Sequence, residues 1–264
     1  MVGPIERSAS PTVIENLARV IVDPTISLPD RYKVLFSLRN VTGPAATAAL
    51  LAALTVPHVG DLFRHDVAFC LGQRRDPAAI ETLLAILRDE SDHSMVRHEA
   101  AEALASVGSS GSGSGGRLPG PDEEGEAPTT STNSTIHASL LDVVRAHVDD
   151  PVREVAETCK LALEKIAYTE RLAKGEEPPR ADENPYYSVD PTPAYPKATP
   201  LSELRAILLD EGASMFDRYQ ALFGIRNRGG DEAVDVLGEC FGAKSALLKH
   251  EVAYVLGQLA RPHR

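Results

Sequence analysis

The chain has 264 residues, 43% of them hydrophobic and 25% charged, which is ordinary for a globular protein with a large core. Its net charge of −11 argues against a nucleic-acid-binding protein, which usually carries a basic face, and is compatible with a cationic ligand or a basic partner. No apolar run approaches ~18 residues, so no membrane-spanning helix is expected.

Helical periodicity dominates from residue 11 onward. Apolar residues recur at three- and four-residue spacing, and no alternating pattern typical of strands competes. Gly-Pro or Asp-Pro pairs mark several helix starts, because a proline in the first helical turn loses no hydrogen bond. Paired helices are predicted at 11–40, 44–73, 77–106 and 135–167, and again at 201–227 and 230–259.

The helix pairs repeat at two scales. Segment 31–40 leads to His65 after 34 residues, and His65 leads to His98 after 33, which is the spacing of a two-helix solenoid repeat. Segment 218–227 repeats 31–40 at an offset of 187, and the segment around His250 repeats that around His65 at an offset of 185. The predicted fold is therefore all-α: an α-α superhelix, a solenoid of helical hairpins, in two homologous halves.

Two segments interrupt the hairpins and divide the chain. Residues 108–134 are rich in Gly and Ser and then acidic, and are predicted to be a disordered insertion because they cannot bury enough apolar surface. Residues 168–200 are predicted to be a Pro-rich linker, with tyrosines that either pack on the solenoid or line a groove. The predicted units are thus an N-terminal half at 1–167 and a C-terminal half at 201–264.

Three histidine–acid pairs occupy the same position of the repeating unit: His65-Asp66, His98-Glu99 and His250-Glu251. Each is preceded by a basic residue. One such pair on a helix is ordinarily a solvated face, but three in register at repeat spacing indicate a shared role. Packed helix axes lie roughly 8–10 Å apart, so imidazoles from neighbouring repeats can converge on one point.

The set His65, His98 and Glu99 offers two imidazoles and one carboxylate. This ligand set with open positions suits non-haem Fe(II) and O₂ chemistry. Zinc-assisted hydrolysis uses similar ligands around a bound water, and the residues alone leave both uses open.

Together, segments 64–73, 95–100, 149–159, 188–191 and 250–258 resemble those of deoxyhypusine hydroxylase, a family of HEAT-repeat di-iron monooxygenases. The resemblance covers essentially the whole chain outside 108–134. It implies O₂-dependent hydroxylation of the deoxyhypusine side chain of translation initiation factor 5A, which forms hypusine. It also implies two Fe(II) ions per full-length protein. The expected location is the cytoplasm and also the nucleus. The partners would be the translation factor and O₂, with no nucleic acid and no membrane.

The resemblance assigns roles to the three pairs. His65, His98 and Glu99 would hold one iron, and His250 would be a ligand of the other. Asp66 and Glu251 would occupy the carboxylate positions that meet the amine groups of the substrate. An acidic groove suits that task, because deoxyhypusine is a polyamine-like cation.

Two departures from the family pattern stand out. The family's Glu is Asp66 here, which keeps the charge but shortens its reach by one methylene. The repeat with a fourth His-Glu pair, expected about 33 residues beyond His250, does not fall within the 264 residues, so the C-terminal half is predicted to be truncated. An alternative function is therefore a catalytically impaired HEAT-repeat scaffold that binds the same translation factor. A lyase-like HEAT-repeat protein acting on a pigment is disfavoured by the His-acid register.

Overall fold

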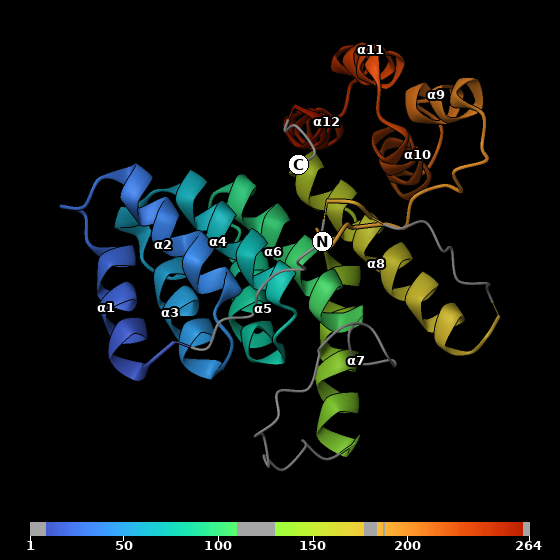
Figure 1. Ribbon diagram of the computed structural model, residues 1–264. Coiled ribbons are helices and arrows are strands. Elements are labelled where there is room, and N and C mark those ends of the chain that lie inside the picture. Colours follow the sequence, from blue (N-terminus) through green and yellow to red (C-terminus); the bar gives the residue numbers. More distant parts are fainter. Residues whose placement is uncertain (1–8, 110–129, 177–183, 187, 261–264) are drawn as a thin grey trace.

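The computed structural model describes residues 9–109, 130–176, 184–186 and 188–260, and these contain helices and no β-strand. The all-α solenoid expected from the sequence is confirmed (Figure 1). The helices are α1 (Pro11–Val22), α2 (Leu28–Asn40), α3 (Pro44–Leu54), α4 (Asp61–Arg74), α5 (Ile80–Arg88), α6 (Ser94–Gly108), α7 (Thr130–Ala146), α8 (Arg153–Ala173), α9 (Leu201–Leu209), α10 (Met215–Arg228), α11 (Asp231–Glu239) and α12 (Ala246–Leu259).

Two predicted boundaries differ from the structure. Residues 110–129 of the predicted insertion lie outside the described residues, but α7 already begins at Thr130, so the end of that segment is helical. Helix α8 continues to Ala173, past the predicted hairpin end at 167. Periodicity locates a helix more reliably than it locates its ends, because capping and packing decide where a helix stops.

In each of three hairpins, an arginine of the second helix is hydrogen-bonded to the end of the first helix. Each of these arginines directly precedes the position taken by histidine in the His-acid pairs or by tyrosine in related repeats. Each donates from Nε to a carbonyl ten residues earlier, in the last turn of the preceding helix. Carbonyls in the last turn of a helix have no intrahelical hydrogen-bond donor, so the arginine supplies one. The distances are 2.8 Å for Arg64 to Leu54, 3.2 Å for Arg97 to Leu87 and 2.9 Å for Arg218 to Leu208.

Two of these arginines also tie one repeat to the next. Arg64 donates to both carboxylate oxygens of Asp92 at 2.6 and 2.5 Å, and Arg97 donates to Asp150 at 2.6 Å. The basic residue before the first two histidines therefore fixes the relative position of neighbouring hairpins. Lys249, before His250, makes no such side-chain bond among the described residues.

Helices α4 and α6 pack unusually closely. A Cβ added at Gly72 of α4 would lie 3.0 Å from Cα of Ala103 in α6. The equivalent Gly257 of α12 has nothing within 4 Å of such a Cβ. The absence of a side chain at Gly72 lets the two backbones approach, which brings the histidines of α4 and α6 side by side.

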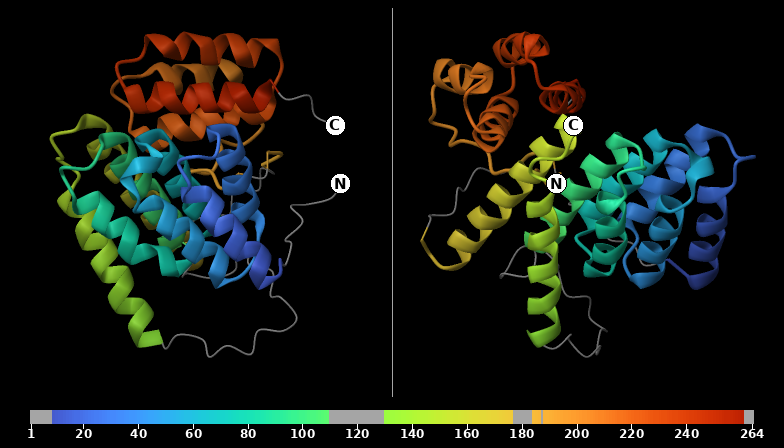
Figure 2. Two further views of the ribbon diagram at one scale, coloured as in Figure 1. Left: turned by 90° about the vertical axis from the view of Figure 1, so that its left-hand side faces the viewer. Right: turned by 180° about the vertical axis from the view of Figure 1, so that it is seen from behind.

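The hydrophobic core forms two clusters that meet at α8. One runs from α1 to α8 and includes Ile166, and the other runs from α8 to α12 and includes Leu161 and Tyr168. Figures 1 and 2 show α9–α12 (orange to red) as a group of helices apart from the row α1–α6, with α8 between them. One long helix thus presents a face to each half.

The connector before α9 is bonded to both halves. The amide of Gln73 in α4 donates to the carbonyl of Val189 at 3.0 Å and accepts from its N–H at 2.8 Å. Asp190 accepts two hydrogen bonds from Arg226 of α10, at 3.0 and 2.6 Å. Tyr186 packs on the solenoid, with the Arg226 guanidinium 4.8 Å from its ring centroid. No described helix is both long and apolar enough to cross a bilayer.

Candidate functional site

Three helices bring the histidines of the His-acid pairs together. His65 of α4 and His98 of α6 have ring centroids 5.3 Å apart, and His250 of α12 lies 5.3 Å from the first and 5.9 Å from the second. His65 and His98 are buried, with 5% and 7% of their surface exposed, whereas His250 is exposed. The register seen in the sequence therefore becomes a cluster that spans both halves.

Glu99 completes a group of ligand atoms with the two buried histidines. Single ligand atoms of His65, His98 and Glu99 lie within 4.8 Å of one another, and all three residues are buried. Glu99 Oε2 is 3.2 Å from His65 Nε2 and 3.8 Å from His98 Nε2. His250 does not belong to this group, so its assignment to another ion stays a prediction.

Neither Nε2 atom has a hydrogen-bond partner among the described residues. The Glu99 oxygen is near both but lies out of hydrogen-bonding alignment. Buried polar atoms nearly always find a partner, so two orphaned ring nitrogens beside a buried carboxylate need explaining. Two neutral nitrogen donors and one anionic oxygen are a suitable ligand set for a divalent transition metal. The residues present fit a metal ion.

The first histidine is held from behind by its own neighbour. Asp66 Oδ1 lies 2.8 Å from His65 Nδ1, and Asp66 Oδ2 accepts a hydrogen bond of 2.5 Å from the hydroxyl of Tyr32 in α2. These bonds leave Nε2 as the nitrogen of His65 that faces His98 and Glu99. Glu251 of α12 is 7% exposed and is not bonded in this way.

The pKa values of the two buried imidazoles are shifted in opposite directions. Burial opposes a charge on His65, but the carboxylates of Glu99 and Asp66 outweigh it and raise its pKa to about 10. Burial, together with the neighbouring His65 and His250 imidazoles, outweighs the attraction of Glu99 and lowers the pKa of His98 to about 4. Burial would raise the pKa of Glu99, yet the neighbouring histidines hold it below its usual value. A metal ion entering this group would displace a proton from His65.

Further carboxylates lie behind the histidines. Burial and the charge of Glu99 raise the pKa of Glu102 to about 8, and burial with the charges of Glu102 and Asp190 raises the pKa of Glu251 well above its usual value. Lys165 is one of the nearby cations, and burial lowers its pKa to about 8. Its Nζ donates to Asp190 O at 3.1 Å. The site is therefore a buried acidic region that favours a cationic ligand.

Several residues of this site are not predicted from the sequence. Glu102 follows Glu99 by three residues, so helical spacing places both on one face, and this signal was available. Tyr32 occupies the corresponding place in the preceding repeat, but nothing in its sequence context identifies Asp66 as its partner. Lys165 and Asp190 come from α8 and the connector, and only the tertiary structure brings them to the site.

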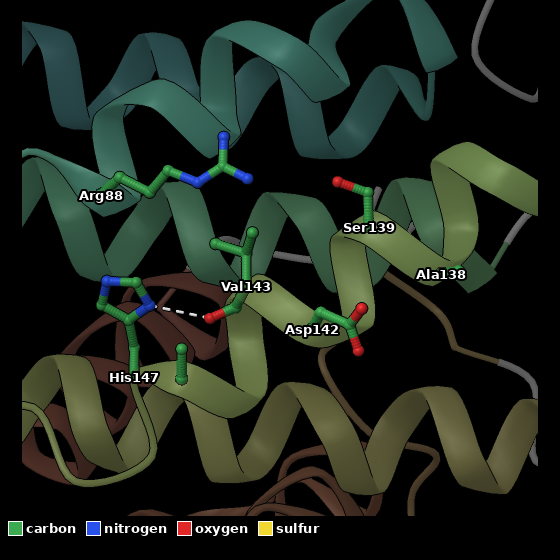
Figure 3. Close-up of a pocket in the computed structure, with 7 residues that line it drawn as sticks. Arg88, Ala138, Ser139, Asp142, Val143 and His147 are labelled. Atoms are coloured by element: carbon green, nitrogen blue, oxygen red, sulfur yellow. Dashed lines mark hydrogen bonds between the residues drawn. The ribbon is translucent and has the colours of Figure 1, made fainter.

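A cavity lies away from the histidine cluster. It has a volume of about 600 Å³ and is lined by Arg88 of α5, by residues of α7 that include Asp142, and by His147 just after the end of α7 (Figure 3). His147 Nδ1 is already 2.8 Å from the carbonyl of Val143. A smaller cavity of about 260 Å³ lies under the connector and is lined by Lys165 and Asp190 among others. The larger cavity contains none of the candidate residues, so ligand chemistry, not volume, identifies the site.

Comparisons with known proteins show which proteins this chain is similar to. Residues 47–113 match the HEAT repeats family. The chain is 42% identical over 246 residues to deoxyhypusine hydroxylase of Gallus gallus, covering 93% of this chain and 70% of that protein. It is 36% identical over 259 residues to the deoxyhypusine hydroxylase of Arabidopsis thaliana, covering 97% of this chain and 73% of that one.

A solved structure is similar as well. The structure of human deoxyhypusine hydroxylase in complex with glycerol superposes with a TM-score of 0.76 at 37% identity. The match covers 94% of this chain and 74% of the human one. The similarity therefore extends over nearly all of the 264 residues and both groups of helices.

Proposed function

Because the chain belongs to the deoxyhypusine hydroxylases, a family of hydroxylating enzymes, we propose that His65, His98 and Glu99 bind Fe(II). The observation that carries the proposal is the pair of buried, unpartnered Nε2 atoms beside the Glu99 carboxylate. Two histidines and one carboxylate leave coordination positions open, which is the arrangement of non-haem iron oxygenases. When bound, the iron supplies the reactivity toward O₂ that amino-acid side chains lack.

The proposed substrate is the deoxyhypusine side chain of translation initiation factor 5A, which O₂-dependent hydroxylation converts to hypusine. An extended cationic side chain suits an acidic site in a chain of net charge −11. We assign the positioning of its amine groups to Asp66 and Glu251. Asp66 uses two of the roughly four acceptor sites of a carboxylate on His65 and Tyr32, so acceptor sites remain for an ammonium group.

The second iron is proposed with His250 as a ligand. His250 is exposed, and its ring faces both buried histidines at 5.3 and 5.9 Å. The 264 residues contain three His-acid pairs, so these residues supply one complete group, with His65, and a partial one, with His250. We therefore expect these 264 residues to hold one iron tightly. We also propose a location in the cytoplasm or nucleus, where the three unpaired cysteines stay reduced.

A metal-binding and product assay tests the proposal. The chain is reconstituted with Fe(II) without oxygen, its iron content is measured, and it is then given O₂ and the deoxyhypusine form of the translation factor. Mass spectrometry reads the addition of one oxygen atom. We expect about one bound iron, and its loss in His98→Ala and Glu99→Gln. His147→Ala is the matched control, because that histidine lies away from the cluster.

Each contrary result has a defined meaning. Absence of iron binding by the wild-type chain, or unchanged binding in both ligand variants, would contradict the metal site. Iron binding without any hydroxylated product would contradict the proposal that this chain catalyses the hydroxylation by itself. Binding of the translation factor that survives both substitutions, without any metal in the wild type, would favour the scaffold function instead.

A further inference from the structure

We propose that Tyr32 is a positioning residue of the metal site: it holds Asp66, and Asp66 in turn orients the ring of His65. This inference rests on the proposed metal site, because orientation of His65 matters there only if its Nε2 binds a metal. Tyr32 touches neither the metal ligand atoms nor the other histidines directly. Its action on the site passes through one carboxylate.

The hydrogen bonds form a continuous chain. The Tyr32 hydroxyl donates to Asp66 Oδ2 at 2.5 Å, and His65 Nδ1 donates to Asp66 Oδ1 at 2.8 Å. Each carboxylate oxygen therefore has one of these two partners. Metal-binding histidines usually donate their other ring N–H to a carboxylate, which fixes both the ring orientation and the nitrogen left for the metal.

Asp66 needs an external anchor to do this. It is the direct neighbour of His65 on α4, and its side chain is 27% exposed, so a rotation toward solvent would break the bond to the ring. Tyr32 reaches Asp66 from a different helix, α2. The tyrosine ring is fixed by an edge-on contact with Phe63, with centroids 5.1 Å apart. A hydroxyl on a fixed ring can therefore hold a short side chain that would otherwise move.

The duplicated half provides a natural comparison. Tyr219 of α10 occupies the position of Tyr32 at an offset of 187 and is fully buried. Its hydroxyl points to the carbonyl of Leu247, 3.5 Å away, and not to the neighbouring His-acid pair at Glu251. Only the first half thus uses this tyrosine to fix a carboxylate, among the residues that the structure covers. Tyr219→Phe is consequently a matched control for Tyr32→Phe.

The test measures Co(II) binding, with Co(II) as a spectroscopic probe in place of iron. Affinity comes from competition with a chelator, and the visible absorption bands report the ligand geometry. Tyr32→Phe should weaken affinity about tenfold, the lower end of the ~10–100-fold loss caused by removing outer partners of metal ligands, and should shift the bands. Tyr219→Phe should leave both unchanged. Tyr32→Phe combined with Asp66→Asn should bind no more weakly than Asp66→Asn alone, because both act through one chain of bonds.

The outcomes separate the two proposals. If the wild-type chain binds no Co(II), the proposed metal site itself fails. If it binds, but Tyr32→Phe keeps the wild-type affinity and spectrum, the positioning role is overturned. Additive losses in the double variant overturn it too, since they would show independent action. If the circular dichroism of Tyr32→Phe shows that this variant is unfolded, Asp66→Asn is used as the only test variant. Unchanged Co(II) affinity in Asp66→Asn would then refute the proposed chain of hydrogen bonds.

Discussion

The rings of His65 and His250 pack edge to face, with centroids 5.3 Å apart and planes at 82°, although 185 positions separate the two residues in the chain. They occupy equivalent places in the duplicated halves. The contact means that each half contributes an imidazole to one cluster. The geometry of the site therefore depends on packing within each half and on how the halves are joined.

Close packing of α4 on α6 should be required for the metal group. Gly72→Ala places a Cβ only 3.0 Å from Ala103 Cα, closer than an ordinary van der Waals contact, and overpacking of this kind costs ~1–3 kcal/mol. The helices must move apart, so we expect weaker metal binding as well as a lower unfolding free energy, measured by chelator competition and by urea denaturation. Gly257→Ala at the duplicated position meets nothing within 4 Å and should not destabilise the protein. Equal losses in both variants would contradict the packing account.

The buried Arg97–Asp150 pair should stabilise the first half strongly. Both side chains are 2% exposed and 2.6 Å apart, so Asp150→Ala leaves a buried guanidinium without its anion. Such a loss costs ~3–5 kcal/mol, read as a shift of the urea midpoint at constant slope. Arg205→Ala breaks a pair whose side chains are 48% and 42% exposed and should cost at most ~1 kcal/mol. Similar shifts in the two variants would show that burial does not decide the effect.

The Asp190–Arg226 pair should hold the connector in its position between the halves. The Arg226 side chain is 0% exposed, and Asp190→Ala removes both of its carboxylate bonds. We expect a broader distance distribution between spin labels placed at exposed Glu81 and Glu232, one in each half. Glu239→Ala, which breaks an exposed ion pair within the second half, should leave the distribution narrow. A distribution unaffected by Asp190→Ala would assign the joining of the halves to other contacts.

Glu102 should make stability fall as pH rises. Its pKa is raised by burial from 4.5 to about 8, so between these values the folded chain retains a proton that the unfolded chain has lost. The folded state then loses stability progressively from about pH 4.5 to about pH 8. In Glu102→Gln this contribution is absent, so its stability relative to the wild type should increase across that window. Parallel pH curves for Glu102→Gln and wild type would refute the burial effect.

The sequence alone was sufficient to predict the helices, the hairpins and the proximity of His65, His98 and Glu99. Helical periodicity is a local property, and neighbouring repeats pack in register, so a spacing of 33 residues predicts that His65 and His98 meet. The resemblance to a family added the chemistry and the roles of Asp66 and Glu251, which remain predictions. Helix ends were less accurate, as the start of α7 at Thr130 shows.

Only the tertiary structure decided how distant residues complete the site. Where His250 meets His65 depends on contacts between the halves, such as those of Gln73 with the Val189 backbone, that no periodic pattern encodes. The bond from Tyr32 to Asp66 depends on two side-chain rotamers, and the raised pKa of Glu102 depends on burial by other helices. Periodicity specifies which face of a helix is apolar and which repeats are neighbours. Orientation, desolvation and long-range convergence are properties of the packed chain.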